Sequence, residues 1–198
     1  MSKDMKTSKL RTYIQSANVN FLFGSGLSKP YLSTLGNIEK MLTELSQSAF
    51  EKTVKTVIEA SIYKDYFTGV ILPNMPNCTT ARDADYKVVI DNYSNFLSIW
   101  NDIFNKRANK LLSKQINIYT TNIDTLVEKA VERTKIEFND GFKGSIKQIF
   151  DEGNFQKSYS KTSLHFQNTF EIPVFNFLKI HGSLNWEKKM TRLSMITY

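Results

Sequence analysis

The sequence contains one cysteine, Cys78, and only two histidines, His165 and His181. A disulfide framework needs paired cysteines, and a structural zinc site needs about four cysteine or histidine ligands. The chain by itself can build neither of them. We therefore expect a site that works without a metal ion.

Long apolar runs are also missing. No stretch approaches the roughly 18 apolar residues that a membrane-spanning helix needs. The first residues, MSKDMKTSKLR, lack the apolar segment of a signal peptide. We therefore expect a soluble, cytoplasmic protein with no membrane partner.

Glycine and proline are few, at 8 and 4 of 198 residues, whereas 41% of the residues are hydrophobic and 13% aromatic. This composition argues against collagen-like and fully disordered chains. A globular chain of this length buries roughly 70% of the surface that it exposes when unfolded. We expect a single domain over residues 1–198.

Acidic residues are outnumbered, with 19 Asp and Glu against 26 Lys and Arg, which gives a net charge of +7. A basic surface suits nucleic acid or an acidic partner. However, no run reaches five or six contiguous like charges, and no nucleic-acid-binding motif is present. We interpret the charge mainly as a solvated surface and expect any contact with nucleic acid to be indirect.

Short apolar, β-prone runs alternate with stretches of helical period. This alternation, with strands that are apolar throughout, is typical of a parallel sheet covered on both faces. The predicted fold class is therefore α/β, a Rossmann-like parallel sheet flanked by helices, with a helical insertion at about 36–113. Residues 139–167 are expected to form a long excursion with little regular structure. The predicted strands are 19–23, 116–120 and 174–180. The predicted helices begin near 38, 54, 86 and 124, and the one that begins near 86 continues to 113.

Polar motifs follow each predicted strand: GSGLS at 24–28, TTNID at 120–124 and HGS at 181–183. The carboxyl ends of parallel strands meet at one edge of a sheet, where ligands bind. We expect these three motifs to form one site.

Each motif taken alone has a plainer interpretation. Gly24 and Gly26 allow a tight turn and a close approach to a pyrophosphate that a following helix would favour, but many strand-to-helix turns use glycine. Asn122 and Asp124 are common helix caps. His181 is either a buried core histidine or a group at the rim of the site. The glycine loop matches neither a Walker A loop nor a complete GxGxxG motif.

In this order, GSGLS, TTNID and KIHGSLNW resemble the glycine loop, the TQNID-type segment and the HG histidine of the sirtuin family. They are most similar to the sirtuin-like domains of bacterial anti-phage defence systems. Those domains combine TTN-x-D, a DGF-type segment such as residues 139–144, and HGSLNW. The motifs span residues 19–186.

The resemblance implies that the chain binds NAD as its substrate. It places Asn122 and Asp124 beside the nicotinamide ribose, and it makes Asn122 and His181 the catalytic residues, with His181 as the base. The residues that it assigns to NAD binding are Gly24, Ser25, Gly26, Ser28, Thr121 and Asp124.

The chain departs from the deacylase sirtuins, because it lacks their four-cysteine zinc module and the G-I-P-D-F-R segment after the glycine loop. The resemblance therefore implies an NAD+ hydrolase of an anti-phage system that depletes cellular NAD. Two alternatives stay open. One is a non-catalytic sensor of NAD or ADP-ribose that regulates an associated ATPase or nuclease, and the other is a sirtuin-type deacylase or ADP-ribosyltransferase.

Sirtuin-type folds continue after the HG segment, whereas only twelve residues follow Trp186. We expect either a chain that is incomplete at its C-terminus or a partner that completes the site. The resemblance further implies a homo-oligomer, together with a HerA-like ATPase or a fused sensor region.

Overall fold

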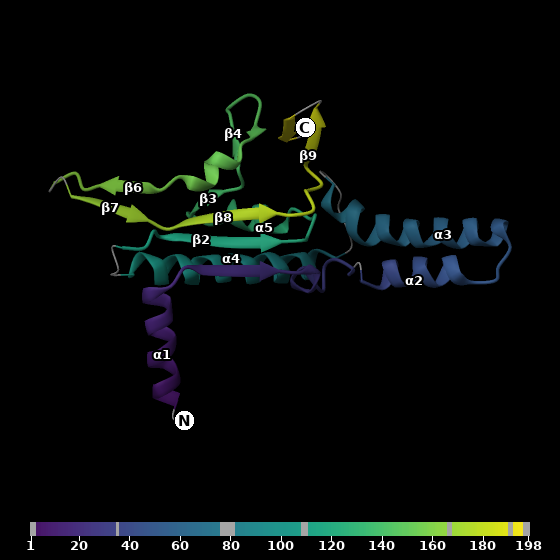
Figure 1. Cartoon of the computed structure of the whole chain (residues 1–198), viewed down its shortest axis with the longest axis horizontal. Coiled ribbons are helices and arrows are strands. Elements are labelled where there is room, and N and C mark those ends of the chain that lie inside the picture. Colours follow the sequence, from purple (N-terminus) through teal and green to yellow (C-terminus); the bar gives the residue numbers. More distant parts are fainter. Residues whose placement is uncertain are drawn as a thin grey trace.

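The main sheet of the protein has four strands, all parallel, in the order β1-β2-β8-β3 (Figure 1). The computed structural model describes residues 3–34, 36–75, 82–107, 111–165, 168–189 and 192–195, so Cys78 lies outside the described residues. The sheet confirms the predicted α/β, Rossmann-like fold. The strands are β1 (Val19–Phe23), β2 (Gln115–Thr120), β8 (Val174–Lys179) and β3 (Glu137–Asn139).

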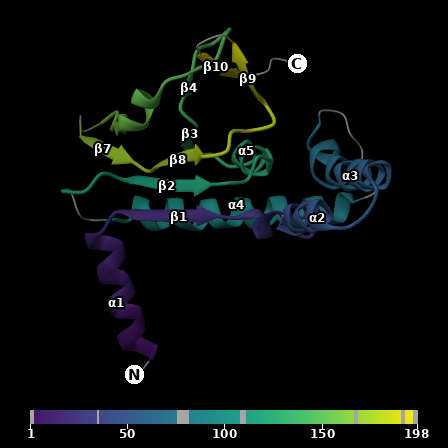
Figure 2. The same cartoon turned by 45° about the vertical axis from the view of Figure 1, so that its right-hand side comes forward.

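A helical insertion separates β1 from β2, as the sequence predicts. Figures 1 and 2 show α2 and α3 lying side by side and extending beyond the carboxyl ends of the strands, whereas α1 projects away from the opposite end of β1. The π-turn η2 (Phe67–Ile71) and the 3-10 turn η3 (Leu72–Asn74) follow α3. The α-helices are α1 (Lys3–Ser16), α2 (Gly36–Gln47), α3 (Lys52–Tyr66), α4 (Asp83–Asn105) and α5 (Leu126–Val131).

The hydrophobic core lies between one face of the sheet and helices α4 and α5. Alternate residues of each strand point to this face, because successive side chains of a strand alternate. Phe21 of β1 contacts Phe96 and Trp100 of α4, with ring centroids 5.0 and 4.8 Å apart. The fully buried residues of the inner strands on this face are Ile116, Ile118, Thr120, Phe175 and Phe177.

The opposite face of the sheet is covered over its inner strands, but not by α4 or α5. In the described residues, α4 and α5 pack on the same face, and the opposite face of β1 is open, with Leu22 76% exposed. The 3-10 helix η4 (Glu152–Gln156) and the residues after it lie against the inner strands, where the Gln115 side chain donates to the Lys157 carbonyl at 2.9 Å. Strand β1 is therefore an edge strand that alternates between covered and exposed residues.

A row of asparagines crosses this opposite face, one from each strand, in register. Asn117 donates to Asn20 at 2.9 Å, and Asn176 donates to Asn117 at 3.0 Å. Asn139 donates to Asn176 at 3.0 Å and to the Asn154 carbonyl at 2.9 Å. A shift of one strand by one residue would break the row, so the row helps to fix the register.

Replacing Asn176 by alanine should lower the free energy of unfolding by about 1–3 kcal/mol, because it leaves neighbouring buried amide groups without their partner. Asn20→Ala, at the exposed end of the row, should cost less than about 0.5 kcal/mol. Urea unfolding of both variants measures the difference. If both variants lost the same free energy of unfolding, the hydrogen-bonded row would add no stability beyond that of its individual side chains.

Two further expectations are wrong. Helix α4 ends at Asn105 rather than near 113, and Leu111 is 94% exposed. Just after the end of α4, the buried Arg107 guanidinium donates to the Ala17 carbonyl at 2.8 Å and to the Ser113 carbonyl at 3.3 Å. Arg107 is therefore a buried structural residue.

Residues 139–167 have more regular structure than expected, since they contain three short strands and η4. The first two strands belong to a second sheet with the order β4-β5-β10-β9, and the third pairs with β7. None of the described helices is long and apolar enough to cross a bilayer. The strands outside the main sheet are β4 (Phe142–Lys143), β5 (Ile149–Phe150), β6 (Tyr159–Thr162), β7 (Thr169–Ile172), β9 (Trp186–Lys189) and β10 (Arg192–Met195).

Candidate functional site

The three polar motifs meet at the carboxyl ends of β1, β2 and β8, which are neighbours in the sheet. Together they border a cavity of about 200 Å³, which we call the motif cavity. Six of the eight residues that the sequence assigns to the site line it: Ser25, Ser28, Thr121, Asn122, Asp124 and His181. The other lining residues are Leu32, Ser33, Glu39, Val70 and Ile123.

Asn122 is the polar group of the site with unused hydrogen-bonding capacity. Its side chain is buried, and its amide nitrogen donates to the Gly24 carbonyl at 3.2 Å and to the Ser28 hydroxyl at 3.4 Å. Its amide oxygen has no hydrogen-bond partner among the described residues. A buried acceptor without a donor is costly, so this atom is suited to a ligand or water that donates a hydrogen bond.

Asp124 uses both of its carboxylate oxygens inside the protein. One accepts a hydrogen bond from the Ser28 hydroxyl at 2.8 Å, and the other accepts from the Leu126 amide at the start of α5 at 3.1 Å. Asp124 therefore satisfies a free amide at the start of α5, as the helix-capping interpretation expects, although Thr125 holds the N-cap position. Because both Ser28 and Asp124 are buried, they form a support behind Asn122.

A buried tyrosine lies behind the same support. The Tyr93 hydroxyl of α4 is 3.4 Å from the Ser28 hydroxyl. Burial raises the pKa of Tyr93 above its ordinary value, and the nearby Asp124 and Glu128 raise it further. The phenol therefore stays neutral and acts as a hydrogen-bonding group.

The glycine loop differs in one respect from the expected strand-to-helix turn. It continues into η1 (Ser25–Ser28), a single 3-10 turn, so the glycine loop does not lead directly into an α-helix. Pro30 follows, and proline cannot continue a helix. The expectation of an α-helix directly after the glycine loop, with its N-terminus toward a pyrophosphate, is therefore wrong.

Both glycines of this loop border open space. A Cβ atom built on Gly24 or Gly26 would meet nothing within 4 Å. Gly24 has an extended backbone with φ of −116°, which other residues also adopt. Neither protein packing nor the backbone at Gly24 requires a residue without a side chain, which leaves room there for a ligand to approach the main chain.

His181 is exposed and lines the motif cavity, so it is not a core histidine. The next residue, Gly182, has φ of +81°, a conformation that side chains other than glycine rarely adopt. The Ile180 amide donates to the Thr120 carbonyl at 2.9 Å, and the Leu184 amide donates to the Ile123 carbonyl at 3.0 Å. These bonds fasten the His181 turn to the TTNID loop.

The helical insertion also contributes to the cavity, which the sequence does not predict. Glu39 of α2 and Val70 of η2 line it. Periodicity could not identify Glu39, because an exposed glutamate on an amphipathic helix looks like an ordinary solvated residue.

The DGF-type segment and the end of the HGSLNW segment meet in an aromatic cluster. Trp186 contacts Phe142 of the DGF-type segment and Phe150, with ring centroids 5.1 and 6.0 Å apart. Trp186 thus helps to pack the second sheet.

No group of three or more histidine, cysteine, aspartate or glutamate side chains in the described part of the chain is placed to hold a metal ion. Comparison with models of known protein families gives no match, and comparison with curated proteins gives none either. The resemblance to sirtuin-like proteins therefore depends on the sequence motifs alone.

Proposed function

We propose that the protein is an NAD+ hydrolase of the sirtuin-like, anti-phage type, which releases nicotinamide and ADP-ribose. One observation carries the proposal. The buried Asn122, with its unpartnered amide oxygen, and the exposed His181 line the same cavity, beside a glycine loop with open space.

The fit to NAD follows from these groups. The open space at Gly24 and Gly26 suits the close approach of a pyrophosphate to the main chain. The Asn122 amide oxygen would accept a hydrogen bond from a ribose hydroxyl or from the attacking water. Ser28 and Asp124 would hold Asn122 in place from behind.

The reaction breaks the bond between C1′ of the ribose and the nicotinamide nitrogen. The electron pair of this bond passes to the pyridinium ring, and nicotinamide leaves as a neutral molecule. The ribose develops oxocarbenium character, and a water oxygen forms the new bond to C1′. His181 would accept the proton that this water loses, because it is exposed to the cavity and carries a basic imidazole.

Incubation of the full-length protein with NAD, alone and with the product of its neighbouring gene, tests the proposal. Chromatography should detect nicotinamide and ADP-ribose in equal amounts. Bound but unconsumed NAD would favour the sensor alternative. Release of nicotinamide that requires an acylated lysine peptide or a protein acceptor would favour a deacylase or an ADP-ribosyltransferase.

A further inference from the structure

Lys179 is the last residue of β8 and has a side chain that is only 1% exposed. Its ammonium group donates to the Asp124 carbonyl at 2.5 Å and to the Ser183 hydroxyl at 2.6 Å. It also pairs with the Glu128 carboxylate of α5 at 2.6 Å. One buried cation therefore joins the TTNID loop, the HGS turn and helix α5.

These contacts lie on both sides of the candidate catalytic pair. Asp124 is two residues after Asn122, and Ser183 is two residues after His181. Two backbone hydrogen bonds already connect the loop and the turn, and Lys179 adds a third link that starts from the rigid sheet. A buried cation with three acceptors has few alternative positions, so it restricts how the two segments move relative to each other.

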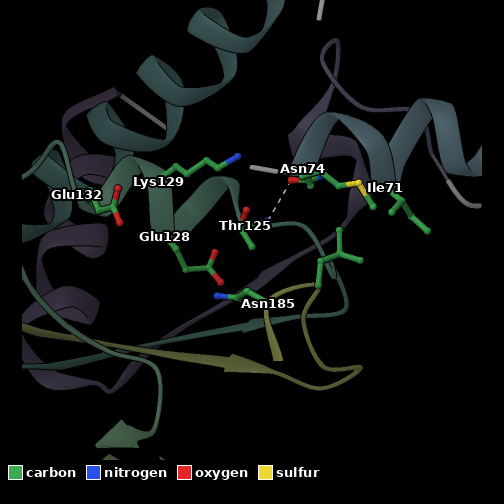
Figure 3. Close-up of a pocket in the computed structure, with 9 residues that line it drawn as sticks. Ile71, Asn74, Thr125, Glu128, Lys129, Glu132 and Asn185 are labelled. Atoms are coloured by element: carbon green, nitrogen blue, oxygen red, sulfur yellow. Dashed lines mark hydrogen bonds between the residues drawn. The ribbon is translucent and has the colours of Figure 1, made fainter. Parts of the chain in front are cut away.

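Glu128 depends on the same cation. Figure 3 shows its carboxylate pointing toward the Asn185 side chain, at the wall of a second cavity of about 380 Å³. Only one carboxylate oxygen is paired, and the other is buried with no hydrogen-bond partner among the described residues. Two other charged groups near Glu128, those of Asp124 and Lys129, carry opposite signs and offset each other. The negative charge of Glu128 is therefore compensated directly by the Lys179 ammonium group.

We propose that Lys179 is a positioning residue, which holds Asn122 and His181 in the mutual arrangement that the reaction needs. The proposal builds on the proposed NAD hydrolysis. Lys179 itself does not line the motif cavity, so it acts through the two segments that it joins.

Lys179→Met, which keeps the length of the side chain, should lower kcat by about 10- to 100-fold with a smaller change in KM, because misplaced catalytic groups affect the transition state most. Lys114→Met is the matched control. Lys114 also donates to a backbone carbonyl, that of Asn105 at 3.0 Å, but it is less buried than Lys179 and lies just before β2, at the opposite end of that strand from the TTNID loop. The control should keep the wild-type kcat.

The pH dependence separates charge compensation from positioning. Burial raises the pKa of Glu128, and the Lys179 ammonium opposes this rise, so Lys179→Met should raise that pKa further. A raised pKa in the folded state means that stability is lost as the pH rises above 4.5, the ordinary value for glutamate. The melting temperature of Lys179→Met should therefore fall with rising pH more steeply than that of the wild type.

The double variant Lys179→Met/Glu128→Gln removes the uncompensated charge. It should lose this additional pH dependence and recover stability, but its kcat should stay low, because the bonds to the Asp124 carbonyl and to Ser183 are still missing. A double variant with wild-type kcat would overturn the proposal and leave Lys179 only a charge-compensating role.

Hydrogen exchange keeps this test independent of the proposed function. In the double variant, the amides of residues 121–126 and 180–184 should exchange faster than in the wild type and in Lys114→Met. Unchanged exchange would overturn the positioning role even if NAD is hydrolysed. If the wild-type protein does not consume NAD but the double variant still exchanges faster than the wild type, the link between the two segments stands and only the proposed hydrolase is refuted.

Discussion

Replacing His181 by alanine is expected to lower the rate of nicotinamide release by about 10²- to 10⁴-fold, the usual contribution of a general base. The side chain is exposed at the cavity, so its removal should not disturb the core. The assay is release of nicotinamide at saturating NAD. His165→Ala, which changes the other histidine of the chain, is the control and should keep the wild-type rate.

Asn122→Ala combined with His181→Ala extends this test. Both residues would act on the same transition state, so their effects should not add, and the double variant should be little slower than the slower single variant. Fully additive losses would indicate that the two side chains act independently. A His181→Ala variant with wild-type turnover would remove the catalytic role of His181.

Replacing Gly26 by valine is expected to abolish NAD binding while the fold is retained. The added side chain would enter space that is open in the protein, so stability should change by no more than about 0.5 kcal/mol. The same side chain would occupy the room that a pyrophosphate needs. Calorimetric titration with NAD and thermal unfolding measure the two effects separately.

Gly26→Ala provides the graded control for this variant. Its smaller side chain should weaken NAD binding less than valine does, in proportion to the space that it fills. Wild-type affinity in Gly26→Val would exclude the glycine loop from the site. A large loss of thermal stability in Gly26→Val, measured without NAD, would mean that Gly26 is needed for the fold instead.

The sequence was sufficient to predict that the three polar motifs meet at one edge of the sheet. Apolar runs such as 116–120 identify strands, and the ends of parallel strands necessarily meet at one edge, so Asn122 and His181 could be placed together without a structure. The capping role of Asp124 was also among the interpretations that the sequence allowed.

Properties that depend on the packing of distant segments could not be predicted in this way. An asparagine inside an apolar strand, such as Asn176, does not reveal that three other strands carry an asparagine in the same register. The sequence likewise gives no sign that α4 and α5 share one face, or that Lys179 turns inward to three acceptors. Each of these follows from the arrangement of the whole sheet and not from a local pattern.

Hydrolysis of NAD in water labelled with ¹⁸O tests the central claim most directly. If water attacks C1′ at this site, the wild-type protein should form ADP-ribose that carries one ¹⁸O atom at the anomeric position, with an equal amount of nicotinamide, and His181→Ala should form much less. The account would be contradicted by NAD that binds to the wild-type protein and is recovered intact. ADP-ribose that forms at the same rate in His181→Ala would contradict it as well.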